Sequence, residues 1–166
     1  HAFAKHGDVT RAKQWLFKME NIRVLPDASC YSAALHACAK VKPLPDIANA
    51  ELLFNKMKKA RIKPSNFIFS SMITCFANNN DISTARLYLD MMKTYNLTPD
   101  LYVLNPLLGA YIRAGEVDSA KAILYKIMDL KLVPDVVSMN LVMQHSNNRD
   151  SGPLIKLFED MLAIGA

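Results

Sequence analysis

The sequence predicts an all-α solenoid of stacked antiparallel helix pairs. In four stretches an alanine is followed 14 residues later by a proline, and these alanines are spaced by 38, 35 and 35 residues. Between the two, apolar residues return at the three-to-four-residue interval of a helix face. The stretch between each proline and the next alanine reads as another helix followed by a turn. A fixed period in this range indicates stacked supersecondary units. The stretches are Ala12–Asp27, Ala50–Ser65, Ala85–Asp100 and Ala120–Asp135.

Local signals mark where the helices begin and end. Proline removes a backbone donor and clashes with a preceding carbonyl, so Pro26 and its counterparts end each unit. Asp8 and Asp46 can cap the helices that follow them, and Gly115 suits a helix C-terminus. Residues 1–6 read as the tail of a helix. The expected helices lie at about 9–22, 28–40, 47–60, 66–77, 82–95, 101–113, 116–130, from 136 onward, and 154–163.

We expect these helices to form one repeat domain over residues 1–166. Its first repeat, at about 1–27, is partial. The second is lengthened by three extra residues in the turn Val41–Asp46, and the fifth is atypical because Leu154–Ala163 is one residue out of register. The later repeats are expected at 28–65, 66–100, 101–135 and 136–166.

A single helix pair cannot bury its apolar stripe alone, so neighbouring pairs must stack. The expected core residues of the first helices are Leu35, Met72, Ile73, Leu107, Leu108 and Val142. The residues expected to face them from the second helices are Leu53, Leu87, Ile123 and Leu157. Methionines recur near one position of the second helices, where we expect them to fill gaps in the core. They are Met19, Met57, Met91, Met92, Met128 and Met161.

Composition restricts the class of protein. The chain has 166 residues, and the 51% that are hydrophobic suffice for a sizeable core. No run of about 18 apolar residues occurs, so no membrane span is expected. Cys30, Cys38 and Cys75 form no C-x-x-C pair and are expected to be buried free thiols in a reducing compartment. The four histidines lack metal-ligand spacing, so we expect no metal and no other cofactor.

The net charge of +5 is unevenly distributed. Residues 28–65 hold seven basic and two acidic side chains, and 7 − 2 = +5 equals the whole excess. This bias permits a polyanionic partner without requiring one. The sequence shows no catalytic constellation, glycine-rich phosphate loop or clustered carboxylate metal site. It therefore predicts a binding protein, not an enzyme, and no small-molecule substrate.

The repeats resemble the pentatricopeptide repeat family. The resemblance rests on the x-Pro-Asp endings, the 35-residue period, the L/F-x-x-M pattern of the second helices and the first-helix start VVSMNLV (Val136–Val142), and it covers essentially the whole chain. The Pro-Asp ending and the period argue against the tetratricopeptide repeat, whose period is about 34 residues. The resemblance implies a right-handed α-solenoid whose first helices line a concave surface that binds single-stranded RNA, one base per repeat. It also implies a mitochondrial or chloroplast location and a role in RNA processing, stability or translation.

In this family two side chains of each repeat read one base. One lies near the start of the first helix, and the other is the last residue of the repeat. The first-helix positions are Ser32, Ser70, Asn105 and Asn140. The repeat-end positions are Asp27, Ser65, Asp100 and Asp135. Serine and asparagine can both donate and accept hydrogen bonds toward a Watson–Crick edge, which suits this role.

The resemblance also implies which bases are read. Asn105 with Asp135 resembles a uracil reader. Ser70 with Asp100 resembles a purine reader that favours guanine. Ser32 with Ser65 departs from the common pairs, so no base is assigned to it. Asn140 suggests a pyrimidine, but its partner would lie beyond the fifth repeat, and Asp27 lacks a first-helix partner.

Two further sets of positions are implied to contact RNA. Three residues before each first-helix reader stand side chains that in the family wedge between bases. They are Ser29, Phe67, Tyr102 and Val137. The aromatic rings of Phe67 and Tyr102 suit stacking, at roughly 1–3 kcal/mol per base, whereas Ser29 does not. At the ends of first helices, cations suited to phosphate contacts recur. They are Lys5, Lys40 and Arg113, with Asn78 and Asn148 in the other repeats.

Alternatives stay open at this point. Asparagine, serine and aspartate at a helix start are also ordinary caps, a role that can coexist with base reading. Phe67 and Tyr102 can cover the seam between repeats, and the basic stretch Lys56–Lys63 can be solvated surface. The irregular second and fifth repeats and Ser29 favour a structural or protein-binding subunit of a large organellar complex such as a ribosome. A third alternative is an appendage of an enzyme, although the deaminase signature H-x-E with P-C-x-x-C is absent.

Overall fold

The structure is a computed structural model that describes residues 9–143 and, further on, residues 152, 155, 156, 158 and 159. Eight α-helices are delimited in this part of the chain, which contains no strand, so the predicted all-α class is confirmed. Every helix end predicted here lies within one residue of the observed end. The helices are α1 Val9–Asn21, α2 Ala28–Lys40, α3 Ile47–Lys59, α4 Asn66–Asn78, α5 Ile82–Thr94, α6 Leu101–Ala114, α7 Val117–Asp129 and α8 Val136–Met143.

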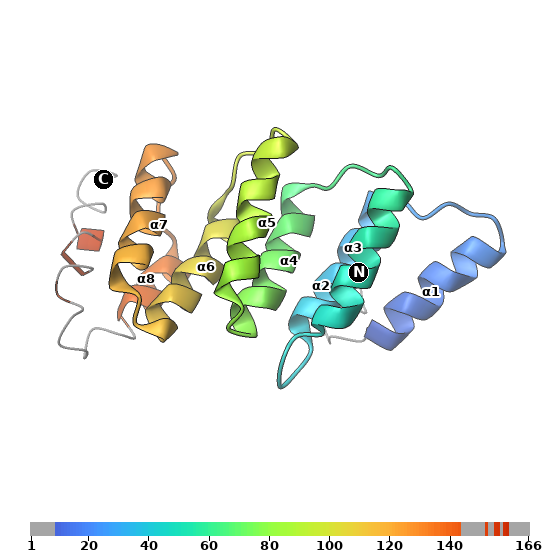
Figure 1. Ribbon diagram of the computed structural model, residues 1–166, viewed down its shortest axis with the longest axis horizontal. Helices are drawn as coiled ribbons and strands as arrows, with labels where there is room; N and C mark the ends of the chain where they lie inside the picture. The colour runs from blue at the N-terminus through green and yellow to red at the C-terminus, as the bar shows by residue number, and fades with distance from the viewer. Residues whose placement is uncertain (1–8, 144–151, 153–154, 157, 160–166) are drawn as a thin grey trace. The chain divides into compact units, whose positions relative to one another are not determined.

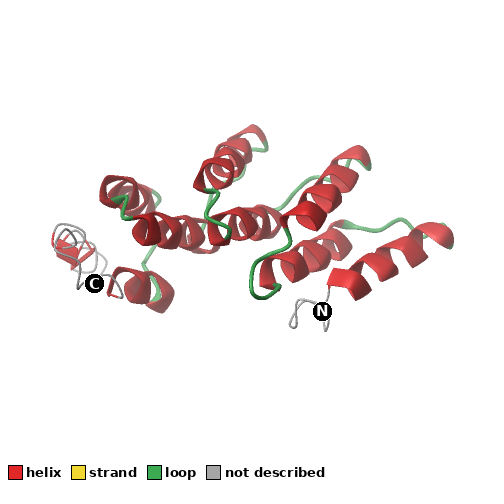
Figure 2. Cartoon of the chain, turned by 60° about the horizontal axis from the view of Figure 1, so that its bottom comes forward, coloured by secondary structure: helices red, strands yellow, loops and turns green. Residues whose placement is uncertain are grey.

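The chain divides into two compact units, His1–Thr98 and Pro99–Ala166. In the first unit, α2 packs against α1, α3 and α4, while α4 packs against α3 and α5 (Figure 1). In the second unit, α6 packs against both α7 and α8. Loops join consecutive helices into hairpins, as Figure 2 shows. Each unit is therefore built as predicted, from antiparallel helix pairs that stack on their neighbours. A single domain over the whole chain stays a prediction.

The same capping bonds start helices in both units. Before α2, α3, α5 and α6, an aspartate accepts a hydrogen bond from the backbone N–H three residues further on, at 2.9–3.1 Å. These bonds satisfy donors that have no partner inside the helix. The predicted cap at Asp46 is thereby confirmed, while Asp8 lies outside the described residues. The four caps are Asp27, Asp46, Asp81 and Asp100.

The second helix of each repeat ends in the same way. One residue adopts a left-handed backbone, with φ of 53–56°, and the next N–H bonds the carbonyl five residues back at 2.9–3.1 Å. The left-handed residues are Arg23, Arg61, Asn96 and Lys131. Their separations, 61 − 23 = 38, 96 − 61 = 35 and 131 − 96 = 35, repeat those of the alanines. Gly115 ends α6 with φ of 74°, as expected of a helix C-terminus.

The predicted core of the first helices is buried. Leu53 and Ile123 of the second helices are also buried, with 3% and 7% exposure. Methionine fills the core fully at Met57 and Met92. Met19, Met91 and Met128 are half-buried, whereas Met161 and Leu157 lie outside the residues described. The first-helix residues, each at most 2% exposed, are Leu35, Met72, Ile73, Leu107, Leu108 and Val142.

The prediction that Leu87 belongs to the core is wrong, because its side chain is 65% exposed. Leu53 and Ile123 each stand three residues after the recurring alanine, and the matching position in the third repeat is Tyr88. Leu87 precedes it by one residue, about 100° around the helix, and so faces outward. The ring of Tyr88 packs against Phe54 and Phe76, with ring centroids 5.3 Å apart in both pairs. Burial there raises the pKa of Tyr88 to about 12.

The three cysteines are free thiols with different surroundings. Cys38 on α2 and Cys75 on α4 are buried as predicted, and burial raises the pKa of each to about 12. Cys30 is only half-buried, although partial burial raises its pKa as well. The described residues hold no group of three His, Cys, Asp or Glu side chains placed to bind a metal. Within the same residues, no helix has the length and apolarity needed to cross a bilayer.

Candidate nucleic-acid interface

In the second unit, the predicted reader pair Asn105 and Asp135 is brought into direct contact. Asn105 lies on α6, and Asp135 immediately precedes α8. The side-chain Nδ2 of Asn105 donates to Oδ1 of Asp135 at 3.1 Å. Asn105 is 6% exposed, whereas Asp135 is exposed. The carboxylate is therefore the accessible member of the pair and the amide is the recessed one.

A third side chain completes this contact. Ser138 is fully buried on α8, and its hydroxyl lies 2.9 Å from Oδ1 of Asn105 and 2.8 Å from Oδ1 of Asp135. The backbone N–H of Ser138 donates to the same carboxylate oxygen at 2.8 Å, so Asp135 also caps α8. Partial burial raises the pKa of Asp135, but the hydrogen bonds from Ser138 and Asn105 outweigh it and hold the pKa below its ordinary value.

Gly109 on α6 lies close to Leu141 on α8. Gly109 lies one helical turn after Asn105, and a Cβ there would come within 3.0 Å of Cδ2 of Leu141. That distance is shorter than an ordinary contact between carbon atoms. A side chain at Gly109 would therefore require the end of Leu141 to shift by a few tenths of an ångström.

The predicted pair Ser32 and Ser65 is not connected in this way. Both residues belong to the first unit, where Ser32 lies half-buried on α2 and Ser65 precedes α4. Ser65 occupies the N-cap position, but its side chain makes no capping bond. No hydrogen bond joins the two serines in the described part of the chain. The structure therefore gives no reader geometry to the pair for which the sequence suggests no base.

The remaining predicted readers are described one at a time. Ser70 is half-buried on α4 of the first unit, whereas Asp100 caps α6 of the second unit through Val103. Asp27 is exposed and caps α2, and the bond from the backbone N–H of Cys30 lowers its pKa. Asn140 is exposed on α8. The capping role that the sequence left open for the aspartates is thus confirmed, alongside any reading role.

The predicted stacking residues differ in their surroundings. Phe67 is 49% exposed, and its ring lies against the imidazole of His36, with centroids 5.2 Å apart. It therefore covers part of the seam between α2 and α4 while keeping an accessible side. Tyr102 is 78% exposed at the start of α6, and Val137 is 54% exposed on α8. Ser29 is exposed on α2.

The predicted phosphate-binding cations stand at the C-terminal ends of first helices. Lys40 is exposed in the last turn of α2, and Arg113 is exposed in the last turn of α6. Asn78 is exposed at the end of α4. Lys5 and Asn148 lie outside the described residues. A cation near a helix C-terminus also compensates the partial negative charge there, so this position has a structural role in addition.

Comparison with known proteins now identifies the family. A family profile described as the pentacotripeptide-repeat region of PRORP matches residues 1–151. The chain belongs to the pentatricopeptide repeat family. No curated protein matches the sequence. The family confirms the resemblance that the repeat endings and the period indicated.

Solved pentatricopeptide repeat structures share the fold. The PPR domain of Arabidopsis thaliana protein-only RNase P 1 (PRORP1), in complex with tRNA, matches at a TM-score of 0.74 and 19% identity, over 98% of this chain and 82% of that one. PPR10 from maize matches at 0.69 and 24% identity, over 98% of this chain and 24% of that one. PPR10 in complex with an 18-nt psaJ RNA element matches at 0.58 and 24% identity, over 98% and 28%.

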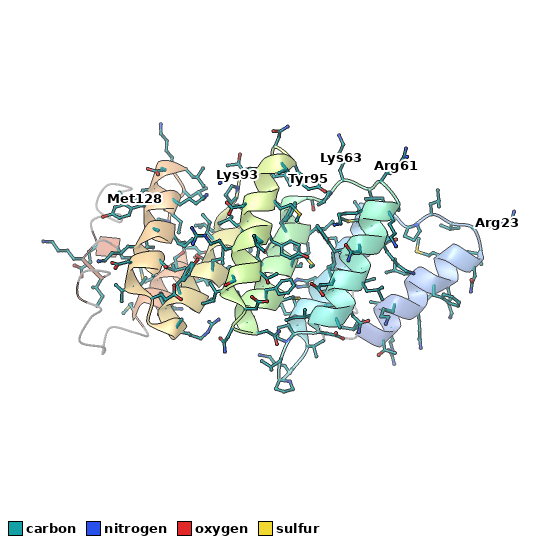
Figure 3. The ribbon with its side chains drawn as sticks, in the orientation of Figure 1. Arg23, Arg61, Lys63, Lys93, Tyr95 and Met128 are labelled. Atoms are coloured by element: carbon teal, nitrogen blue, oxygen red, sulfur yellow. The ribbon has the colours of Figure 1, made fainter. Side chains whose placement is uncertain are left out.

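The repeat register reveals two features that sequence reasoning missed. The first is Ser138, which stands three residues after Asp135 in a place where earlier repeats carry other residue types. The second is a repeated basic position: Arg23, Arg61 and Lys131 each have a left-handed backbone after a second helix. Figure 3 labels Arg23 on the loop that follows α1, and Arg61 and Lys63 on the loop that follows α3. Both arginines stand 11 residues after a recurring alanine, so alignment of the repeats could have found them.

Proposed function

We propose that the chain is a single-stranded RNA-binding module that selects bases through its repeats, with Asn105 and Asp135 as its best-formed reader. The hydrogen bond between these two side chains is the observation that supports the proposal most strongly. Both residues stand at the repeat positions that read bases in the family, and their side chains are in direct contact. The RNA complexes of PRORP1 and PPR10 make RNA the first partner to test.

The chemistry of the pair suits uracil. The amide of Asn105 has two N–H donors and two acceptor lone pairs, and its bonds to Asp135 and Ser138 use one of each. Oδ1 of Asp135 and Oγ of Ser138 lie only 2.8 Å apart, so they occupy the edge of the amide on which its N–H and its oxygen lie side by side, and the remaining N–H and lone pair point toward opposite ends of the group. Uracil offers an N–H for the remaining lone pair of the amide oxygen, or a carbonyl oxygen for the remaining amide N–H. Cytosine presents an unprotonated ring nitrogen in place of that N–H, so the amide oxygen would meet another acceptor.

Neighbouring groups support an extended strand at this site. Tyr102 and Val137 flank the pair along the chain, and their exposed side chains suit contact with the faces of a base. Arg113, at the far end of α6, suits a phosphate. We propose that these residues position the strand and that the Asn105–Asp135 pair selects the base. On this proposal the module works in a mitochondrion or chloroplast, in RNA processing, stability or translation.

The proposal is tested by binding the chain to a pool of short single-stranded RNAs and sequencing the retained species. We expect enrichment of RNAs with one invariant uracil, and affinity that falls with salt at a slope of about −0.7 per phosphate contact. Asn105→Ala should abolish the uracil preference, whereas Asn55→Ala, an exposed asparagine on α3, should not change it. An unenriched pool, or unchanged enrichment with Asn105→Ala, would contradict base reading.

A second candidate function is protein binding, and a groove in the first unit favours it. The groove, of about 300 Å³, lies among α1, α2 and α3. Its walls include Phe17 and Leu52, which are 61% and 48% exposed, and its lining contains Lys13 and Lys56 but no acidic residue. An apolar surface flanked by lysines suits an amphipathic helix that carries carboxylates. This chemistry corresponds to the alternative of a structural subunit of a large organellar complex.

Phe17→Asp tests this candidate, with Leu87→Asp as the matched control because Leu87 is equally exposed but outside the groove. We expect a partner that survives ribonuclease treatment, is lost with Phe17→Asp and is kept with Leu87→Asp. An acidic synthetic peptide that spans the bound segment should then bind the purified chain directly. Retention of the partner by Phe17→Asp would reject the groove as its binding site.

A further inference from the structure

We infer that Ser138 is a positioning residue for base selection: its buried hydroxyl holds the amide of Asn105 in the one orientation that reads uracil. The inference rests on the proposed function. It adds a third residue to a reader that family resemblance limits to two. Four observations carry it: the repeat register, the burial of a hydroxyl, the hydrogen-bond distances and the donor balance of the network.

The register makes Ser138 exceptional among the repeats. The residue three positions after the last residue of a repeat is Cys30, Ile68 or Val103 in the earlier repeats and Ser138 here. Ile68 and Val103 are fully buried and apolar. A packing role at this position therefore needs no hydroxyl, and burying one is unfavourable unless it is hydrogen-bonded.

Burial singles out the same residue. Three polar side chains are buried in the described part of the chain, and they are Ser71, Asn105 and Ser138. Ser71 bonds the carbonyl of Phe67 within its own helix. Asn105 and Ser138 instead bond each other across two helices, at 2.9 Å. Their burial is thus joint, and each removes the unfavourable desolvation of the other.

The donor balance fixes the direction of the bond between Asn105 and Asp135. A carboxylate only accepts, so the Asn105 atom that faces Asp135 must be the amide nitrogen and the atom that faces Ser138 must be the amide oxygen. The Ser138 hydroxyl has one proton and two acceptors within reach. Oδ1 of Asp135 already receives N–H bonds from Asn105 and Ser138. Donation to Asn105 therefore satisfies the most groups.

The result is a closed ring of three residues. The backbone N–H of Asp135 lies 3.3 Å from the Ser138 oxygen and completes it. Rotation of the Asn105 amide by 180° would set its oxygen against the carboxylate, so the bond to Asp135 resists the flip, whereas the Ser138 hydroxyl can accept from the amide nitrogen as well as donate to the amide oxygen. Ser138 instead gives the amide a second anchor, at its oxygen. Without Ser138 the amide is held at its nitrogen alone and presents its remaining donor and acceptor over a wider range of directions.

Ser138→Ala tests the inference on the full chain, with Val103→Ala as the control for lost volume at the same repeat position. The first readout is the side-chain amide signal of Asn105 in NMR spectra of the free protein. We expect that NH₂ group to exchange its hydrogens faster in Ser138→Ala than in the wild type. In Val103→Ala the exchange rate should be the same as in the wild type. The second readout is the ratio of affinities for the selected RNA and for its uracil-to-cytosine variant. We expect this ratio to fall roughly three- to tenfold with Ser138→Ala, the effect of one hydrogen bond, and to stay unchanged with Val103→Ala.

The outcomes separate the two proposals. If the wild type distinguishes uracil from cytosine and Ser138→Ala distinguishes them equally well, the positioning role is overturned. The proposed Asn105–Asp135 reader is then unaffected. A wild type that does not distinguish uracil from cytosine would overturn both, whatever the NMR spectra show. Loss of discrimination together with faster exchange, both absent from Val103→Ala, supports the positioning role. Circular dichroism on each variant confirms that the helices are retained.

Discussion

The Asn105–Asp135 and Ser32–Ser65 pairs occupy the same repeat positions but have different structures. In the second unit, Asp135 caps α8, accepts a bond from Asn105 and lies beside a buried hydroxyl. In the first unit, Ser65 precedes α4 without a side-chain cap, and the described residues show no bond between it and Ser32. The comparison teaches that one aspartate can cap a helix and hold a neighbouring side-chain amide at once, because one carboxylate oxygen accepts from both.

The largest expected effect is a difference in stability between variants of the two pairs. Asp135→Ala removes the cap of α8 and leaves the buried amide of Asn105 without its acceptor, so we expect the free energy of unfolding to fall by about 2 kcal/mol. Ser65→Ala removes a side chain that makes no capping bond and should change it by less than about 0.5 kcal/mol. Urea denaturation of both variants measures the difference. Equal losses would show that the contact at Asp135 does not stabilise the fold.

The next largest expected effect is on RNA affinity, because only the Asn105–Asp135 pair has an aromatic side chain beside it that can stack on a base. Tyr102 precedes Asn105 by one helical turn, and its exposed ring can lie against a base, so Tyr102→Ala should weaken RNA binding about tenfold. Ser29 holds the matching position before Ser32 and has no ring, so Ser29→Ala should leave the affinity unchanged. Fluorescence anisotropy with the selected RNA measures both. An unchanged affinity with Tyr102→Ala would show that this tyrosine does not stack on a base.

A smaller change in stability is expected when the Ser32–Ser65 pair is given the carboxylate of the Asn105–Asp135 pair. Ser65→Asp introduces the carboxylate that caps α2, α3, α5 and α6, and an anion at a helix N-terminus is favourable. We expect it to raise the free energy of unfolding by about 0.5–1 kcal/mol. Thermal denaturation followed by circular dichroism at 222 nm checks this. A destabilised variant would show that the backbone at Ser65 cannot accept the cap geometry of Asp27 and Asp100.

The smallest expected effect is a dependence on pH that only the second pair has. The pKa of Asp135 lies below the 3.8 of an unperturbed aspartate, because its hydrogen bonds outweigh partial burial. A lowered pKa in the folded state stabilises the fold above pH about 4, and this contribution disappears as the pH falls through the lowered value. NMR titration of the Asp135 carboxyl and the Asn105 amide should show one shared midpoint below 3.8. A midpoint above 3.8 would contradict the observed ring.

Local signals made most of the fold predictable. Proline, aspartate and glycine act on the backbone within one helical turn, so the helix ends followed from Pro26, Asp46, Gly115 and their counterparts. The prediction of a buried side chain failed at Leu87 because a displacement of one residue moves a side chain about 100° around a helix. The division into two units had no counterpart among the sequence signals.

The candidate site was only partly predictable. The positions of Asn105 and Asp135 followed from family resemblance, and the capping role of Asp135 from its place after proline. Ser138 was missed because its role depends on the approach of α8 to α6 at Gly109, which no short-range pattern encodes. Alignment of the repeats marks it as unusual, but only the structure shows that it reaches Asn105.

Recoding the second pair tests the central claim most directly, namely that Asn105 with Asp135 selects one base. Asn105→Ser gives the pair the composition of Ser70 with Asp100, which in the family resembles a guanine-favouring reader. RNA-pool selection with this variant should replace the invariant uracil by guanine and leave the flanking bases unchanged. Retention of uracil at that position would contradict the claim.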